Sequence, residues 1–252
     1  MQWFGAMPER DEITALIMRS RHAVALTGAG VSTAAGIPDF RGKDGIYVTG
    51  RYSPTVFDLA AFHADPMPFF QFARDFLTAL ERITPTFTHR FLAALERAGK
   101  LDAVITQNID GLHQRAGSRN VVELHSGFAT AICTGCRRRV SCDVLRPMVL
   151  QGGVPQCARC GGVLKPDVVF FGEEVSAMPR AVSLAERADL MLVLGSSLTV
   201  FPAAALPSFV PGLVVVVNRD PATVDHPRVH FRWGDADAVL RQVADRMAVE
   251  VP

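Results

Sequence analysis

Residues 22–30 read His-Ala-Val-Ala-Leu-Thr-Gly-Ala-Gly. The first six residues form a short apolar run, which is typical of a strand buried on both faces of a parallel sheet. Two glycines follow at its end, and glycines at this place predict a tight turn. Ligands of open α/β sheets bind beyond the carboxyl ends of strands. We therefore expect a parallel sheet whose binding edge includes Gly28 and Gly30.

Similar patterns recur along the chain. Further strands are expected at 101–106, 121–124, 189–194 and 213–217, with an extended segment at 167–171, and helices at 58–82, 89–98, 179–188 and 235–247. Strands that alternate with helices predict a parallel sheet with helices on both faces. Between Gly127 and Gly162 the composition changes to paired cysteines, arginines and glycines, which indicates an inserted module; 41–86 is a second, helical insert.

The glycine turn is a weak signal by itself. It resembles the start of the dinucleotide fingerprint G-x-G-x-x-G, but Thr33 replaces the third glycine. A plain strand-to-helix connection is an equally good interpretation. Two more strand ends carry small or polar residues, Gly195-Ser196-Ser197 and Asn218, and together the three ends favour a nucleotide site.

The strongest local motif is Cys133-x-x-Cys136 followed by Cys157-x-x-Cys160. Two such pairs at this separation predict a tetrahedral four-thiolate zinc site, structural because no coordination position stays open. Gly135, Gly161 and Gly162 lie in or after the two turns, where positive φ is often needed. Redox pairs or disulfides are the alternative, and Cys142 is left over as an ordinary thiol.

Composition excludes several classes of protein. The chain of 252 residues is 49% hydrophobic and 20% charged, which argues against disorder. Its net charge of +1 gives no electrostatic case for nucleic-acid binding. No signal peptide is visible, and the apolar runs are shorter than the ~20 residues that span a bilayer. We expect a cytoplasmic protein. Only three of the 26 basic residues are lysines, Lys43, Lys100 and Lys165.

Polar residues crowd another strand end, where residues 106–113 read TQNIDGLH. His125 follows the expected strand 121–124, and a histidine there is a candidate base. These motifs, with 36–41 (GIPDFR), 168–173 (VVFFGE), 195–198 (GSSL) and the cysteine pairs, resemble the sirtuins, the NAD-dependent protein deacylases. The resemblance runs in order from about residue 20 to residue 240.

The resemblance implies a discontinuous Rossmann-type NAD-binding domain at 1–41, 87–127 and 163–252, and a smaller domain made of a helical insert at 42–86 and a zinc module at 128–162. It implies NAD as co-substrate, one structural zinc ion and these NAD contacts: Gly28, Ala29, Gly30, Thr33, Asp39, Phe40 and Arg41; Gln107, Asn108, Ile109, Asp110 and His125; Gly195, Ser196, Ser197, Asn218, Asp235 and Ala236. The implied catalytic residues are His125, Asn108 and Asp110. Val168, Phe171, Gly172 and Glu173 would border a groove in which an acetylated peptide adds as an extended strand.

By the same resemblance, the acyl-lysine oxygen displaces nicotinamide from the ribose, His125 acts as general base, and lysine and 2′-O-acyl-ADP-ribose are released. Two departures bear on this. Ser126 stands where the family usually has glycine. Members of the family that remove succinyl groups carry a tyrosine and an arginine three residues apart. Here Arg74 stands at the arginine position, but Gln71 stands at the tyrosine position. We therefore expect a neutral acyl group as substrate. The alternatives are ADP-ribosyl transfer to protein and a weakly catalytic NAD- and peptide-binding module. We expect a monomer that binds neither membrane nor nucleic acid.

Overall fold

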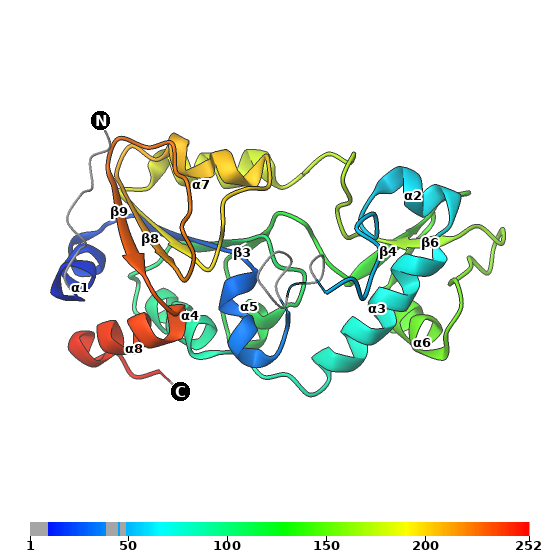
Figure 1. Ribbon diagram of the computed structural model, residues 1–252, viewed down its shortest axis with the longest axis horizontal. Helices are drawn as coiled ribbons and strands as arrows, with labels where there is room; N and C mark the ends of the chain where they lie inside the picture. The colour runs from blue at the N-terminus through cyan, green and yellow to red at the C-terminus, as the bar shows by residue number, and fades with distance from the viewer. Residues whose placement is uncertain (1–9, 39–44, 46–48, 252) are drawn as a thin grey trace. The chain divides into compact units, whose positions relative to one another are not determined.

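The computed structural model describes residues 10–38, 45 and 49–251 (Figure 1). The chain divides into two compact units. The larger comprises Met1–Ile37, Thr84–Leu124 and Ser176–Pro252, and the smaller comprises Pro38–Ile83 and His125–Val175. These bounds differ from the expected ones chiefly at the end of the smaller unit, which reaches Val175 and not residue 162. The reason is β6 (Leu164–Pro166), which pairs with β4 (Thr130–Cys133) in the small sheet.

The larger unit contains a six-stranded sheet in which every neighbouring pair is parallel. Its order is β3 (Val121–Glu123), β2 (Ala103–Thr106), β1 (Ala23–Thr27), β7 (Leu190–Leu194), β8 (Leu213–Asn218) and β9 (Val229–Trp233). The predicted fold class is confirmed. The edge strand β9 was not predicted, because all its residues stay partly exposed and it lacks an uninterrupted apolar run.

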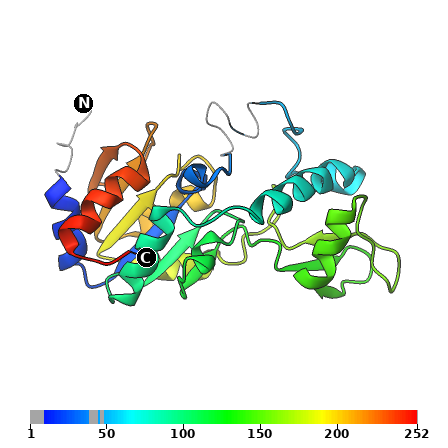
Figure 2. The ribbon, with the colours of Figure 1, turned by 90° about the horizontal axis from the view of Figure 1, so that it is seen from below.

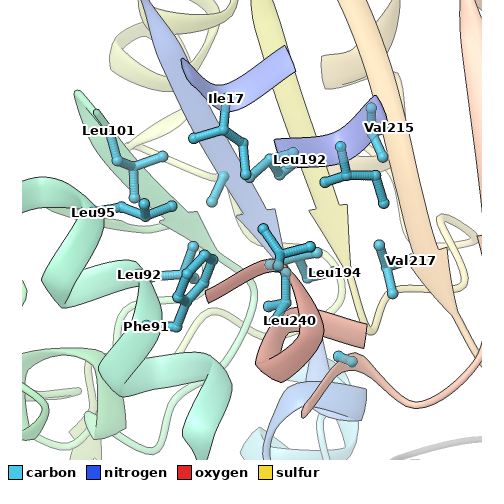
Figure 3. Close-up of a cluster of buried hydrophobic side chains, with 14 of the residues drawn as sticks. Ile17, Phe91, Leu92, Leu95, Leu101, Leu192, Leu194, Val215, Val217 and Leu240 are labelled. Carbon is cyan, nitrogen blue, oxygen red and sulfur yellow. The ribbon is translucent and has the colours of Figure 1, made fainter. Parts of the chain in front are cut away.

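Helices cover both faces of this sheet. Figure 1 shows α7 (Met178–Arg187) across the sheet from α4 (Phe87–Arg97) and α8 (Ala236–Met247). The side chains of α4, α8 and α1 (Arg10–Arg19) pack on the strands in one buried cluster. Figure 3 shows part of it: Ile17, Phe91, Leu92, Leu95, Leu101, Leu192, Leu194, Val215, Val217 and Leu240. Burying each such side chain contributes about 1.5–3 kcal/mol, so the sheet is a rigid support for the loops at its edge.

The helical insert differs from the expected single helix at 58–82. It forms α2 (Leu59–Ala64) and α3 (Met67–Leu80), separated at Asp65 and Pro66. A proline disfavours helical backbone in the residue before it. Asp65 accordingly has extended dihedrals, φ −149° and ψ 105°, which end α2.

The smaller unit has its own sheet and core. Strands β5 (Arg139–Ser141), β4 and β6 form an antiparallel sheet in that order, and α6 (Cys142–Gln151) follows β5. Helices α3 and α6 lie next to each other (Figure 2), joined by an ion pair between Glu81 and Arg146. Phenylalanines from α2, α3 and the loops fill the core. Across both units, no helix within the described ranges has the length and apolarity needed to cross a membrane.

Candidate active site

Three glycines meet where β1 and β7 end. The Gly30 amide donates to the Gly195 carbonyl at 2.9 Å. A Cβ atom on Gly30 would lie 2.8 Å from Gly195 Cα, and one on Gly28 would lie 2.8 Å from the Gly195 carbonyl oxygen. Both distances are shorter than any normal contact, so only glycine fits. The turn continues into two short 3₁₀ helices, η1 (Ala29–Val31) and η2 (Thr33–Ala35), and not into an α-helix.

A hydrogen-bonded network joins this turn to the end of β2. The Ser32 hydroxyl donates to Asp110 Oδ2 at 2.7 Å and accepts from Asn108 Nδ2 at 3.1 Å. The same Asn108 amide group donates to the Gly28 carbonyl at 3.2 Å. Asp110 Oδ1 accepts from the Leu112 amide at 2.9 Å. The polar atoms at this edge are therefore held in place before any ligand arrives.

Asp110 is a buried carboxyl group within this hydrogen-bonded network. It is only 8% exposed, and burial raises its pKa above the usual range, against the lowering effect of the hydrogen bonds from Leu112 and Ser32. Side chains with perturbed pKa values at a strand end mark a functional site. Ser32 was not among the predicted site residues, although it directly follows the predicted turn.

Two of the predicted NAD contacts, Gln107 and Ser196, also lie together. Gln107 Nε2 donates to Ser196 Oγ at 2.9 Å, and Ser196 Oγ accepts from the Leu198 amide at 3.2 Å. Leu198 has a φ of +52°, which is unusual for a large side chain and typical of strained functional loops. The segment after β7 is thus closely tied to the end of β2.

The remaining predicted residues of this unit occupy other strand ends. Asn218 ends β8, and its amide donates to the Asp220 carbonyl at 2.8 Å. Asp235 caps α8 by accepting from the Ala238 amide at 2.9 Å and pairs with Arg219 at 2.6 Å. Burial acts to raise the pKa of Asp235, but these bonds, the charge of Arg219 and a further bond from the Asp237 amide hold it below its usual range. Ala29, Thr33, Ile109, Ser197 and Ala236 lie on the same turns; Asp39, Phe40 and Arg41 lie outside the described residues.

Two buried histidines lie behind the network. His113 Nε2 is 2.9 Å from Thr27 Oγ1, and the His89 ring lies 4.5 Å from the His113 ring between centroids. Burial lowers the pKa of His89 to about 3 and that of His113 well below the usual range. Both rings are therefore neutral parts of the core, and their burial is a tertiary effect that the sequence pattern does not reveal.

His125 belongs to the smaller unit, where it opens the segment after β3. Its carbonyl accepts from the Val169 amide at 3.0 Å. The next residue, Ser126, has a φ of +50°, in the left-handed region that favours glycine. The conformation thus agrees with the glycine usual at this position, and the serine adopts it under strain. Val168, Phe171, Gly172 and Glu173 form the neighbouring segment of this unit, and Phe171 is 49% exposed.

The four predicted zinc ligands converge. Their sulfur atoms all lie within 4.8 Å of one another, with 3.4 Å between Cys133 and Cys160 and 3.8 Å between Cys136 and Cys157. A tetrahedral site with zinc–sulfur bonds of about 2.3 Å needs sulfurs about 3.8 Å apart. Disulfide sulfurs are about 2 Å apart, and all five cysteines are free. The residues fit a structural zinc ion.

Hydrogen bonds within the two turns favour the thiolate form of Cys133 and Cys157. The Cys136 amide donates to Cys133 Sγ at 3.4 Å, and such bonds lower the pKa of Cys133 to about 6. Gly161 has a φ of +74° as expected. Gly162 has no positive φ; a Cβ there would lie 3.0 Å from Cys133 Sγ, so close approach requires this glycine.

Comparison with known proteins gives a consistent result. Residues 28–202 match the Sir2 family model. The chain is 42% identical over 221 residues to an NAD-dependent protein deacetylase of Sulfurisphaera tokodaii, covering 86% of this chain and 88% of that protein. Two similar solved structures are Sir2 with a p53 peptide and NAD+ (38% identity, TM-score 0.86) and a Sir2 variant with a deacetylated p53 peptide and 3′-O-acetyl ADP ribose (39%, TM-score 0.88). Each alignment covers 96% of this chain and 100% of the other. The chain therefore belongs to the Sir2 family, the sirtuins.

Proposed function

We propose that the protein is an NAD-dependent protein deacetylase: acetyl-lysine, NAD and water give free lysine, nicotinamide and O-acetyl-ADP-ribose, with the acetyl group transferred to the ribose from which nicotinamide departs. Family membership supports the reaction class. The single observation that carries the assignment within the molecule is the Ser32–Asn108–Asp110 network, because it presents fixed polar groups beside a glycine turn that no side chain could occupy.

The glycine turn fits NAD because it stands at the carboxyl end of β1, where ligands of open parallel sheets bind, and its close packing on Gly195 keeps the turn compact. Ala29 and Thr33, on the turn formed by Gly28 and Gly30, would hold the pyrophosphate, with Gln107 on the ribose side and Ser196, Asn218 and Asp235 on the adenosine side. Bound NAD supplies the activated ribose that receives the acetyl group. Asn108 and Asp110 orient the nicotinamide and its ribose, and the hydrogen bonds that each makes with Ser32 keep them rigid without solvent reorganisation.

His125 is assigned as the general base that takes a proton from a ribose hydroxyl. Its main chain is bonded to Val169, so the base and the segment 168–173 share one local framework. An extended peptide bound along that segment would be recognised mainly through its main chain, which reads side-chain sequence only loosely. The substrate class is therefore acetylated protein in extended conformation.

The acyl preference follows from Arg74. Its guanidinium lies against Gly152 at the end of α6: a Cβ on Gly152 would be 3.5 Å from Arg74 Cζ. A cation near a helix carboxyl terminus interacts favourably with the helix dipole. Gln71, one turn earlier on α3, is exposed and uncharged. Arg74 thus serves the packing of α3 on α6, and we infer a preference for acetyl over succinyl groups.

Mass spectrometry of an acylated peptide library with and without NAD tests the assignment. We expect NAD-dependent loss of the acetyl mass, with nicotinamide and O-acetyl-ADP-ribose as products, and little change in succinylated peptides. The variant His125→Ala should lose turnover while keeping its zinc content. Peptides that gain the mass of ADP-ribose would instead identify the alternative transferase, and peptides that bind without reacting would identify a binding module.

We propose a monomer that acts in the cytoplasm without binding membrane or nucleic acid. The near-neutral net charge of +1 supports the absence of a nucleic-acid partner. Sedimentation equilibrium with and without acetylated peptide measures the oligomeric state directly.

A further inference from the structure

Lys165 is a lysine in an unusual place. Its side chain is only 12% exposed, although lysines are almost always at the surface. It lies in β6, where it pairs with Ile132 of β4, the strand that ends in the zinc ligand Cys133. A buried ammonium is costly unless acceptors surround it, so its contacts define what it does.

The ammonium group of Lys165 finds one acceptor for each of its three protons. Lys165 Nζ lies 2.8 Å from Glu173 Oε2, 2.9 Å from the Val168 carbonyl and 3.3 Å from the Pro166 carbonyl. It also lies 4.2 Å from the centre of the Phe170 ring, a favourable cation–π distance. Glu173 Oε2 in turn accepts from the Phe170 amide at 2.8 Å. One ammonium thus ties together both ends of the segment 166–173.

The tied segment is the one assigned to the substrate. Main-chain bonds also join it to neighbouring segments: the Val169 amide donates to the His125 carbonyl at 3.0 Å, and the Phe171 amide donates to the Phe57 carbonyl at 2.8 Å. Lys165 holds this segment from the side of the zinc sheet. Glu173 Oε2 accepts both from Lys165 and from the Phe170 amide, so this carboxylate also holds the segment together.

We propose that Lys165 is a positioning residue for the acetylated peptide: with Glu173 it holds the segment 166–173 in the conformation that binds the substrate main chain. The proposal rests on the deacetylase function proposed above and deepens it. It assigns Lys165 no contact with NAD or with the reacting atoms. Loss of the ammonium should therefore weaken peptide binding and leave the use of NAD unchanged.

The test compares Lys165→Met with Lys100→Met. Methionine keeps a long apolar stem but removes the charge and the three donors. Lys100 is a matched control, because it lies in the larger unit, where its Nζ donates to the Met18 carbonyl at 3.0 Å at the protein surface. Steady-state kinetics with an acetylated peptide should show the peptide KM of Lys165→Met raised about tenfold. The KM for NAD, kcat and the zinc content should stay within about twofold of wild type.

A peptide KM within twofold of wild type in folded, zinc-loaded Lys165→Met overturns the proposal. A rise in the KM for NAD as large as the rise in the peptide KM also overturns it, because it indicates a general structural role. If Lys165→Met does not fold, Lys165→Gln, which retains a hydrogen-bond donor, decides by the same two KM values. Failure of the deacetylase assignment itself would appear separately, as a wild-type enzyme that leaves acetylated peptide unreacted in the presence of NAD.

Discussion

The buried His89 predicts how stability depends on pH. It lies at the third position of α4, where its Nδ1 accepts from the Thr86 amide at 3.2 Å in a capping box. We assign the proton to Nε2, because Nδ1 is the acceptor. Burial holds the pKa of His89 at about 3, against 6.5 for a free histidine. The native state thus keeps His89 neutral where the unfolded chain accepts a proton.

The sign and size of the effect follow from this pKa. A depressed histidine pKa leaves stability intact above the unfolded value and removes it as pH falls from about 6.5 toward about 3. Each unit of pH inside that window costs about 1.4 kcal/mol. Between pH 7 and pH 5, His89 alone should lower the free energy of unfolding by about 2 kcal/mol. His113 adds to the loss, because burial shifts its pKa in the same direction.

The variant His89→Gln isolates this contribution. Glutamine is a normal residue at the third position of a capping box, so its side-chain oxygen can accept from Thr86 without titrating. Urea unfolding followed by circular dichroism at pH 7 and pH 5 should show a loss about 2 kcal/mol smaller in His89→Gln than in wild type. The exposed His63 provides the control His63→Gln, which should keep the wild-type difference. An unchanged pH dependence in His89→Gln would refute the reasoning.

Three further changes probe the site and the metal. Gly30→Ala should raise the KM for NAD at least tenfold at unchanged zinc content, because the new methyl group would lie 2.8 Å from Gly195 Cα. Steady-state kinetics and zinc analysis measure the two quantities, and a wild-type KM would contradict the close approach of the two glycines. Ser126→Gly should raise the free energy of unfolding by about 0.5–1 kcal/mol, because relief of the backbone strain at this left-handed position outweighs the greater entropy of the unfolded chain. Urea unfolding measures the change, and a lower free energy of unfolding would show that the serine is not strained. Cys157→Ser should purify without stoichiometric zinc and with reduced helix content, whereas Cys142→Ser should retain one zinc ion. Elemental analysis measures the zinc content of the two variants, and circular dichroism measures their helix content. Full zinc content in Cys157→Ser would exclude the four-thiolate site.

The sequence pattern predicted structure correctly where neighbouring residues carry the signal. The run of apolar residues before Gly28 predicts a buried strand, and β1 (Ala23–Thr27) is fully buried. The two Cys-x-x-Cys turns predict converging sulfurs, because each pair is brought together by its own short turn. Pro66 carried a local signal that the expectation of one long helix overlooked, and it ends α2.

The sequence by itself determined the buried strands of the large sheet, the glycine turn and the zinc ligands, since neighbouring residues specify each of them. Only the tertiary structure decided which distant segments meet. Gly30 touches Gly195 because β1 and β7 pair in the sheet. Ser32 reaches Asp110 because β1 also pairs with β2. Parallel strands pair only through long crossovers, so strand order and register depend on how the whole core packs. The same holds for the burial of His89 and for the acceptors around Lys165, whose chemistry depends on the atoms that folding brings to them.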